Sequence, residues 1–203
     1  MRTLGLYERA LKLASSKKAQ QRRPDVVNML RDASSNGDAR ATYALATWHL
    51  FGIGLRKNYR AAAILLQKAA KAGHAQAQFD LAVCYETGKG RSRNRREAFR
   101  WYSRAARRSD PDATAAVARF YYYGLSPAKN RESAAKWYRL AAERGSAEAA
   151  YALALCYEYG DGLKCDPAAA LRWYKRAAAG GDVLARRALR ELQRARARGR
   201  KRK

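Results

Sequence analysis

Apolar residues recur at intervals of 36 positions through the middle of the chain, and the same residue types return at corresponding places. One such column consists of the alanines Ala41, Ala77, Ala113, Ala149 and Ala185. An aliphatic column consists of Leu45, Leu81, Val117, Leu153 and Leu189. A unit this short cannot bury enough apolar surface to fold alone, so it must pack against its neighbours. The pattern therefore predicts a tandem array of similar units in place of one mixed core.

The first half of each unit is expected to form a helix, which we call helix A. In the copy at residues 73–108, Ala77, Leu81 and Tyr85 fall four residues apart and so share one helical face. Gly88 follows them, and glycine readily adopts the left-handed conformation that ends a helix.

The second half of each unit is expected to form helix B. Its predicted N-caps share a side chain that accepts bonds from free backbone amides, and they are Asn58, Asn94, Asn130 and Asp166. An apolar stripe with helical spacing follows in the second copy and consists of Ala98, Trp101, Tyr102, Ala105 and Ala106. The tryptophan returns as Trp137 and Trp173. The sequence therefore predicts an all-α fold of helix-loop-helix repeats.

An alanine-leucine-tyrosine helix, a Gly-x-Gly loop, a capping Asn or Asp and an Ala-x-x-Trp-Tyr-x-x-Ala-Ala helix follow one another in each unit. This order resembles the Sel-one-like repeats, which are relatives of the tetratricopeptide repeats. The resemblance implies a right-handed α-solenoid with a 36-residue period and capping helices at both ends. The departures are local: Leu65 and Leu66 replace Trp-Tyr, Ser126 replaces a loop glycine, and Arg91 replaces an aliphatic residue.

The repeat arithmetic predicts the organisation of the chain. Residues 1–36 form N-terminal capping helices with a partial repeat, and residues 37–180 form the full repeats at 37–72, 73–108, 109–144 and 145–180. A C-terminal capping helix is expected at 181–195, followed by a basic, disordered tail at 196–203. No apolar run is long enough to span a membrane.

The formal net charge of +26 concentrates in particular segments. Residues 89–108 carry a net charge of +8 and residues 186–203 a net charge of +9. The predicted basic patch consists of Arg91, Arg93, Arg96, Arg100, Arg104, Arg107, Arg108, Arg196, Arg198, Arg200, Lys201, Arg202 and Lys203. Such a patch could bind an acidic protein, RNA or DNA without sequence specificity, or an anionic lipid surface. The alternative is that these arginines are only a solvated helix face in an arginine-rich chain.

No catalytic constellation, cofactor motif or metal-ligand spacing stands out, so we expect a protein that is not an enzyme and holds no cofactor or metal. His49 occupies the tyrosine column and is expected to be a core or interface residue, while His74 lies in an inter-repeat turn. Cys84, Cys156 and Cys165 lack the regular spacing of paired cysteines, which favours a reducing cytoplasm.

Helix A lines the concave side of related solenoids, so its variable columns are candidates for partner recognition. The predicted protein-binding residues are Glu86, Arg119, Tyr122, Tyr123, Glu158 and Tyr159. The alternative role for residues in these columns, for Tyr43 and Phe51 especially, is to fill space between repeats.

By resemblance, members of the family are non-enzymatic scaffolds that bind proteins or peptides, in bacteria often in signalling, host interaction or toxin-immunity systems. The leading hypothesis is a cytoplasmic adaptor that holds a segment of a protein partner, which we expect to be acidic. A specific version is an immunity or chaperone-like protein for an acidic toxin or effector. The alternative is a nonspecific nucleic-acid-associated factor that acts through its tail and the arginines of helix B. The sequence leaves the oligomeric state open.

Overall fold

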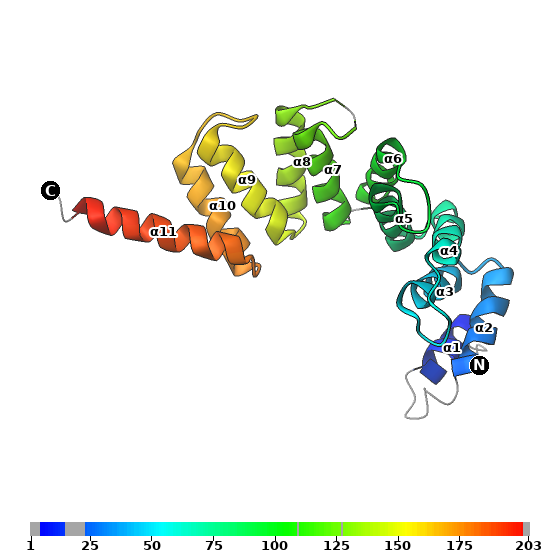
Figure 1. Cartoon of the computed structure of the whole chain (residues 1–203). Helices are drawn as coiled ribbons and strands as arrows, with labels where there is room; N and C mark the ends of the chain where they lie inside the picture. Colours follow the sequence, from blue (N-terminus) through cyan, green and yellow to red (C-terminus); the bar gives the residue numbers. More distant parts are fainter. Residues whose placement is uncertain (1–4, 15–22, 109, 127, 201–203) are drawn as a thin grey trace. The chain divides into compact units, whose positions relative to one another are not determined.

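The computed structural model describes residues 5–14, 23–108, 110–126 and 128–200. Within these ranges the chain forms eleven α-helices and no strand (Figure 1). The helices are α1 (Leu6–Ala14), α2 (Arg23–Ser35), α3 (Ala39–Phe51), α4 (Tyr59–Lys71), α5 (Ala75–Thr87), α6 (Arg95–Ala106), α7 (Pro111–Tyr123), α8 (Arg131–Glu143), α9 (Ala147–Tyr159), α10 (Pro167–Ala179) and α11 (Val183–Arg200). The predicted all-α fold of paired helices is confirmed, with α3, α5, α7 and α9 as helices A and α4, α6, α8 and α10 as helices B.

The chain divides into two compact units, Met1–Arg104 and Ala105–Lys203. In the first unit, α3 packs most extensively on α4, and in the second α7 packs on α8 and α9 on α10. These pairs are the helix A and helix B partners of single repeats, so these three repeats are hairpins of two helices. The division into two units was not predicted from the repeat pattern.

Polar side chains begin the helices where the sequence pattern placed them. Asn58 accepts a hydrogen bond from the backbone N–H of Ala61 at 3.0 Å, and Asp166 accepts bonds from Ala168 and Ala169, both at 2.9 Å. Each bond satisfies a backbone donor that has no partner within its own helix. The predicted capping column of helix B is therefore confirmed at these positions.

Helix A ends at a glycine in the left-handed conformation. Gly88 terminates α5 with φ of 80°, and its N–H donates to the carbonyl oxygen of Cys84. A side chain with a Cβ is disfavoured at this φ, which is why glycine occupies the position. The same cap returns as Gly52, Gly124 and Gly160.

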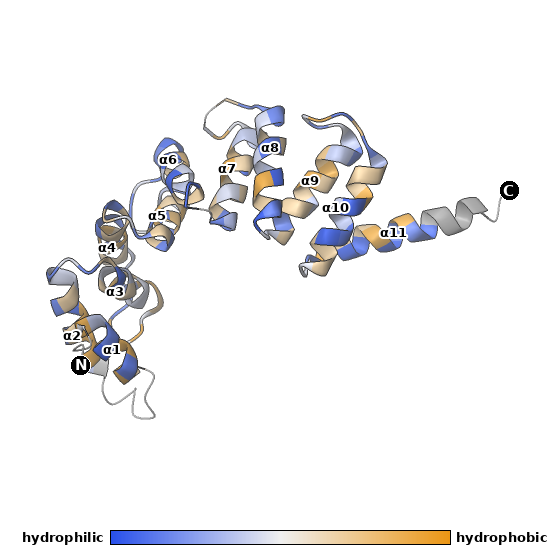
Figure 2. Cartoon of the chain, turned by 180° about the vertical axis from the view of Figure 1, so that it is seen from behind, coloured by the Kyte–Doolittle hydropathy of each residue, from blue (hydrophilic) through white to orange (hydrophobic). Residues whose placement is uncertain are grey.

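Small apolar residues form the core of each unit. The first unit buries Ala10, Val26, Leu30 and Leu45 together. The second buries a larger cluster that includes Tyr138 and Tyr174 of helices B, and the partly buried Trp137 and Trp173 pack against it. Hydrophobic and hydrophilic residues alternate along single helices, as the colours of the described part of α11 show (Figure 2). Alanine at the closest contacts lets the helices approach while the aromatic rings fill the remaining space.

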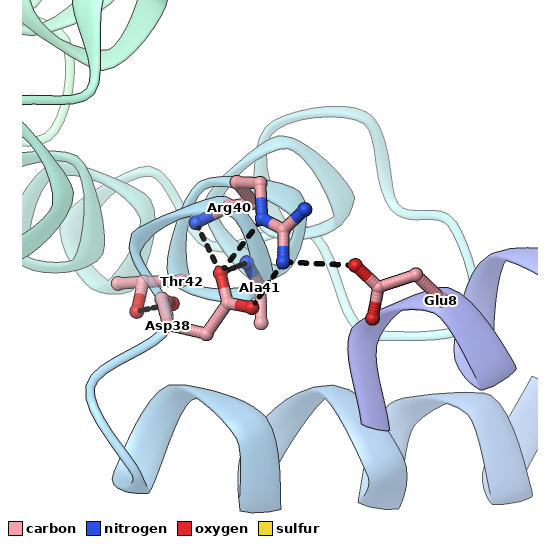
Figure 3. A network of polar contacts seen from close by, with 5 residues as sticks. All are labelled: Glu8, Asp38, Arg40, Ala41 and Thr42. Carbon is pink, nitrogen blue, oxygen red and sulfur yellow. Dashed lines mark hydrogen bonds and ion pairs between the residues drawn. The ribbon is translucent and has the colours of Figure 1, made fainter. Parts of the chain in front are cut away.

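Arg40 joins the first helix to the first full repeat (Figure 3). Its Nη2 lies 2.9 Å from Asp38, the N-cap of α3, and 3.0 Å from Glu8 on α1. Its guanidinium also lies over the ring of Tyr7, at 4.6 Å from the centroid. These contacts hold α1 against the N-terminal end of α3.

The last helix is longer than the sequence pattern indicated. We expected the capping helix to end near residue 195, and α11 continues to Arg200. Alanine and arginine are strong helix formers, so the segment propagates as a helix without apolar residues to bury. Lys201, Arg202 and Lys203 lie outside the described residues.

Candidate protein-interaction surface

Three aromatic side chains stand exposed at the C-terminal ends of helices A. Phe51 of α3 is 72% exposed, Tyr123 of α7 is 64% exposed and Tyr159 of α9 is 71% exposed. They share one column of the repeat, each directly before the glycine that ends its helix. Exposed aromatic rings of this kind are frequent anchors in protein interfaces. Tyr123 and Tyr159 are among the predicted binding residues, and Phe51, whose alternative role is packing between repeats, leaves most of its side chain in water.

The two predicted glutamates are already engaged within the protein. Glu86 of α5 accepts a hydrogen bond from the hydroxyl of Tyr102 on α6 at 2.8 Å, and Glu158 of α9 accepts one from Tyr174 on α10. Burial, followed by the bond to Glu158, raises the pKa of Tyr174, so this tyrosine stays protonated and donates. Both glutamates therefore pair helix A with helix B of the same repeat.

Tyr122 is held by the loop that follows α9. Its hydroxyl donates to Oδ2 of Asp161 at 2.8 Å, and the same carboxylate oxygen accepts a bond from Nη1 of Arg131 at 2.8 Å. The Arg131 guanidinium lies over the Tyr122 ring, 3.7 Å from its centroid. Burial and the bond to Asp161 raise the pKa of Tyr122. Tyr122 thus ties two successive repeats together.

The second unit contains five of the six predicted binding residues, of which Tyr122 and Tyr123 are in direct contact. Arg119, half-buried on α7, lies with its guanidinium 5.6 Å from the centroid of the Phe120 ring. Tyr123 packs edge-on against Tyr122 at 5.0 Å between ring centroids. The Tyr122 hydroxyl in turn reaches the loop just beyond α9, the helix that carries Glu158 and Tyr159. Glu86 belongs to the first unit.

The first unit contains a groove of about 440 Å³ that the sequence reasoning missed as a single site. One wall comes from α3, which contributes Tyr43, Thr47, Leu50 and Phe51. The other wall comes from α5, which contributes Asp80, Val83 and Cys84. Several of these residues lie in the variable columns of helix A, and this variability is the signal for the groove in the sequence. It could not show which repeats leave space between their helices.

Positive charge lines one end of this groove. Lys57 and Lys89 both contribute to its lining together with Tyr59, the first residue of α4. Their Nζ atoms lie 5.1 and 5.5 Å from the centroid of the Tyr59 ring. A hydrogen bond with Lys57 lowers the pKa of Tyr59, and the charges of both lysines act in the same direction.

A carboxylate lies at the other end of the groove. Asp80 accepts a hydrogen bond from the hydroxyl of Tyr43 at 3.0 Å, and the Tyr43 ring stacks on His74 at 4.4 Å between centroids. Burial, followed by the charge of Asp80, raises the pKa of Tyr43. His74 is the N-cap of α5, because its Nδ1 accepts a bond from the N–H of Ala77 at 3.2 Å.

The predicted basic patch contains residues with different surroundings. Arg91 is half-buried, with Nη2 donating to Gln67 at 2.9 Å and its guanidinium 3.9 Å from the centroid of the Tyr85 ring. Arg93 donates to the carbonyl oxygen of Glu86. Arg100 pairs with Glu97 at 2.7 Å, and the Arg104 guanidinium lies 4.5 Å from the centroid of the Trp101 ring.

The remaining predicted basic residues lie on the surface or near the end of the chain. Arg96, Arg107 and Arg108 are exposed. Arg196, Arg198 and Arg200 lie on the last turns of α11. The patch therefore combines exposed arginines with others that pack on aromatic rings, and its role in binding stays a prediction.

His49 and the three cysteines are the next residues to consider, because their side chains could act as nucleophiles, bases or metal ligands. His49 places Nδ1 at 3.3 Å from the carbonyl oxygen of Arg56. All three cysteines are free, with Cys84 and Cys156 buried and Cys165 exposed. Burial raises the pKa of the Cys156 thiol to about 11. Among the described residues, no group of His, Cys, Asp and Glu side chains is arranged to hold a metal ion. No described helix combines the length and hydrophobicity that spanning a bilayer requires.

Helix hairpins repeated at a constant period along the chain place it in the class of helical repeat proteins. The Sel1 repeat family matches residues 39–74, 75–110, 111–146 and 147–182, and the chain belongs to this family. The predicted resemblance is confirmed.

Solved structures of similar proteins agree with this assignment. A Sel1 repeat protein from Oxalobacter formigenes is 33% identical, with a TM-score of 0.78 over 87% of this chain and 71% of that one. The protective antigen c5321 of uropathogenic Escherichia coli, which has an SLR fold, is 23% identical with a TM-score of 0.82. The match to c5321 covers 89% of this chain and 38% of c5321.

The immunity protein Pa5087 of Pseudomonas aeruginosa is 23% identical, with a TM-score of 0.53 over 89% of this chain and 66% of that one. At this identity the likeness concerns the fold. The comparison with curated proteins gave no match.

Proposed function

We propose that this protein is a non-enzymatic scaffold that binds a segment of a protein partner on the surface formed by its helices A. The observation that supports this proposal is the column of exposed aromatic side chains at Phe51, Tyr123 and Tyr159. Burying apolar rings of this size against a partner removes apolar surface from water, which favours binding. Membership of a repeat family that generally serves protein interaction supports the same function.

The partner is proposed to be acidic, because the net charge of the chain is +26. Charge complementarity raises the association rate and disfavours basic competitors. A finer version is an immunity or chaperone-like protein that binds an acidic toxin or effector in the cytoplasm. The fold that the chain has in common with the immunity protein Pa5087 supports this version at the level of architecture.

The test is capture of a partner by the tagged full-length chain from cells that produce it, with nuclease added to the lysate. The variant Tyr123→Ala/Tyr159→Ala removes two exposed rings without touching the buried core, so we expect the captured protein to be lost while the far-ultraviolet circular dichroism is unchanged. Ile64→Ala is the matched control, because Ile64 is a large apolar side chain that is 61% exposed on a helix B. If both variants retain the partner equally, binding through the ends of helices A is wrong.

A further inference from the structure

The groove between α3 and α5 has the dimensions of a site for a short peptide. Its volume of about 440 Å³ lies within the roughly 300–1,000 Å³ that is typical of ligand sites. Tyr43 and Phe51 lie eight residues apart on α3 and both line the groove, which gives a length of about 12 Å along the helix. An extended peptide advances about 3.3 Å per residue, so about four residues fit along this length.

The middle of the groove is apolar. Thr47 and Leu50 of α3 face Val83 of α5 across it, and all three side chains are half-buried. Phe51 borders the same space with 72% of its surface in contact with water. A bulky apolar side chain inserted here would leave water and cover part of the Phe51 ring, which favours binding in proportion to the apolar area removed from water.

The two ends of the groove carry opposite charge. Lys89 directly follows the glycine that ends α5, and the Cβ of Lys57 lies beside the glycine that ends α3. Both lysines therefore lie at the C-terminal ends of the two helices. Asp80 lies about two turns earlier on α5, where it accepts the Tyr43 hydroxyl. A ligand in the groove meets positive charge at one end only.

We propose that this groove binds a short extended protein segment in which one bulky apolar residue is followed or preceded closely by a carboxylate. The apolar side chain lies between Thr47 and Val83, and the carboxylate is held by Lys57 and Lys89. This inference rests on the proposed function and names the chemistry of the bound segment. The carboxylate of Asp80 and the apolar walls favour a protein segment over the continuous phosphate backbone of a nucleic acid.

The experiment selects a displayed library of random short peptides on the full-length protein. Enriched peptides are then synthesised with a fluorescent label, and their affinity is measured by fluorescence anisotropy. We expect the enriched sequences to pair a bulky apolar residue with an Asp or Glu within two positions. Enrichment without an acidic residue at a constant distance from the apolar residue, or no enrichment, overturns the proposal.

Variants locate the binding on the protein. Lys57→Glu/Lys89→Glu is expected to weaken binding of the selected peptide by at least about tenfold, because two attractive charges become repulsive. Thr47→Trp, which fills the groove, is expected to abolish binding with both lysines intact. Lys129→Glu is the control, since Lys129 occupies the column of Lys57 two repeats later, and it should change the affinity by less than about twofold.

Two outcomes separate this inference from the proposed function. Binding that is lost in Tyr123→Ala/Tyr159→Ala but kept in the groove variants shows that the protein binds peptides through another surface, and the groove assignment is then wrong. Displacement of the peptide by a single-stranded oligonucleotide at low salt, with full recovery at high salt, shows electrostatic capture and also overturns it. Circular dichroism of each variant checks that the helices are retained.

Discussion

At the scale of single residues, the variable columns of helix A follow their packing partners on helix B. The column of Leu50, Glu86, Tyr122 and Glu158 lies sixteen positions before the column of Leu66, Tyr102, Tyr138 and Tyr174. Glutamate occurs where the partner tyrosine donates a hydrogen bond, and Tyr122 packs edge-on near Tyr138 at 6.2 Å between ring centroids. Glu86 and Glu158 therefore each bond to helix B of their own repeat. The sequence pattern could not show these bonds, and the part of both glutamates in partner recognition stays a prediction.

The bond between Tyr174 and Glu158 gives a prediction about stability. Tyr174→Phe leaves a carboxylate without its donor, and hydrogen bonds to charged groups contribute about 1.5–3 kcal/mol. We expect the free energy of unfolding to fall by roughly that amount, measured by urea denaturation. Tyr159→Phe is the control, because its side chain is 71% exposed and the change should lie within about 0.5 kcal/mol. Equal effects of the two substitutions would show that the bond does not stabilise the repeat.

His74 predicts a dependence of stability on pH. Burial lowers its pKa, while the charges of Asp80 and Asp38 act in the opposite direction. The unfolded chain therefore takes up the proton at higher pH than the folded protein does. The stabilisation from the neutral cap is present above the ordinary histidine pKa of about 6.5 and is lost as the pH falls through the lower folded-state value.

The variant His74→Ser tests this dependence, since Ser146 fills the corresponding cap in a later repeat and does not titrate in this range. Unfolding free energies of the two proteins are compared between about pH 7.5 and about pH 5. We expect the natural chain to lose more stability than the variant as the pH falls. Parallel curves for the two proteins would contradict the assigned role of His74.

At the scale of helices and loops, most of the architecture could be predicted from the sequence. The 36-residue period predicts that the alanine and aliphatic columns lie on the faces that meet, and the alanines of that column from Ala41 to Ala185 are all buried. The capping residues mark where each helix begins, and the glycines mark where helix A ends. The end of α11 could not be predicted from apolar spacing, because a helix of alanine and arginine continues on intrinsic propensity alone. The constant 36-residue spacing gives no sign of the division into two units.

The loop between helices A and B gives a prediction at this scale. A Cβ added at Gly90 would lie 2.0 Å from the carbonyl oxygen of Tyr59, at the start of the preceding helix B. Nothing lies within 4 Å of the corresponding position at Gly145, although both glycines have positive φ. Gly145→Ala should cost about 1–2 kcal/mol from backbone strain alone. Gly90→Ala should cost clearly more, because the loop must also move away from Tyr59.

Urea denaturation of the two variants checks this difference, since the backbone strain is common to both and the close approach is not. Similar midpoints and slopes would mean that the loop packs on the preceding repeat less closely than the structure shows. A lower slope for Gly90→Ala alone would indicate that the two repeats no longer unfold together.

At the scale of the whole molecule, the charge of the chain exceeds what its own acidic residues can neutralise. There are 43 Lys and Arg residues against 17 Asp and Glu residues. Several arginines nevertheless serve the fold: Arg144, for example, donates to the carbonyl oxygen of Ala106 at 2.8 Å and to the Thr114 hydroxyl at 2.7 Å. Net charge alone therefore does not identify a nucleic-acid-binding protein. Protein binding and nucleic-acid capture are distinguished by what retains the captured partner: the apolar groups of helices A in the first case, and the surplus positive charge in the second.

This contrast predicts how binding responds to nuclease, salt and loss of the basic end of α11. If the aromatic residues of helices A anchor a protein partner, nuclease leaves the complex intact and a chain ending at Leu192 still binds, because Leu189 and Leu192 keep α11 packed on the core of the second unit. Added salt should lower the association rate by about tenfold or more and change the dissociation rate little, because long-range charge steers the encounter while buried contacts set the lifetime. Surface plasmon resonance with the captured partner measures both rates.

Loss of binding after nuclease treatment or after truncation at Leu192 would instead support nonspecific capture of nucleic acid. For that mechanism the equilibrium affinity for duplex DNA should fall with salt at a log-log slope near −5 when about six phosphates are neutralised.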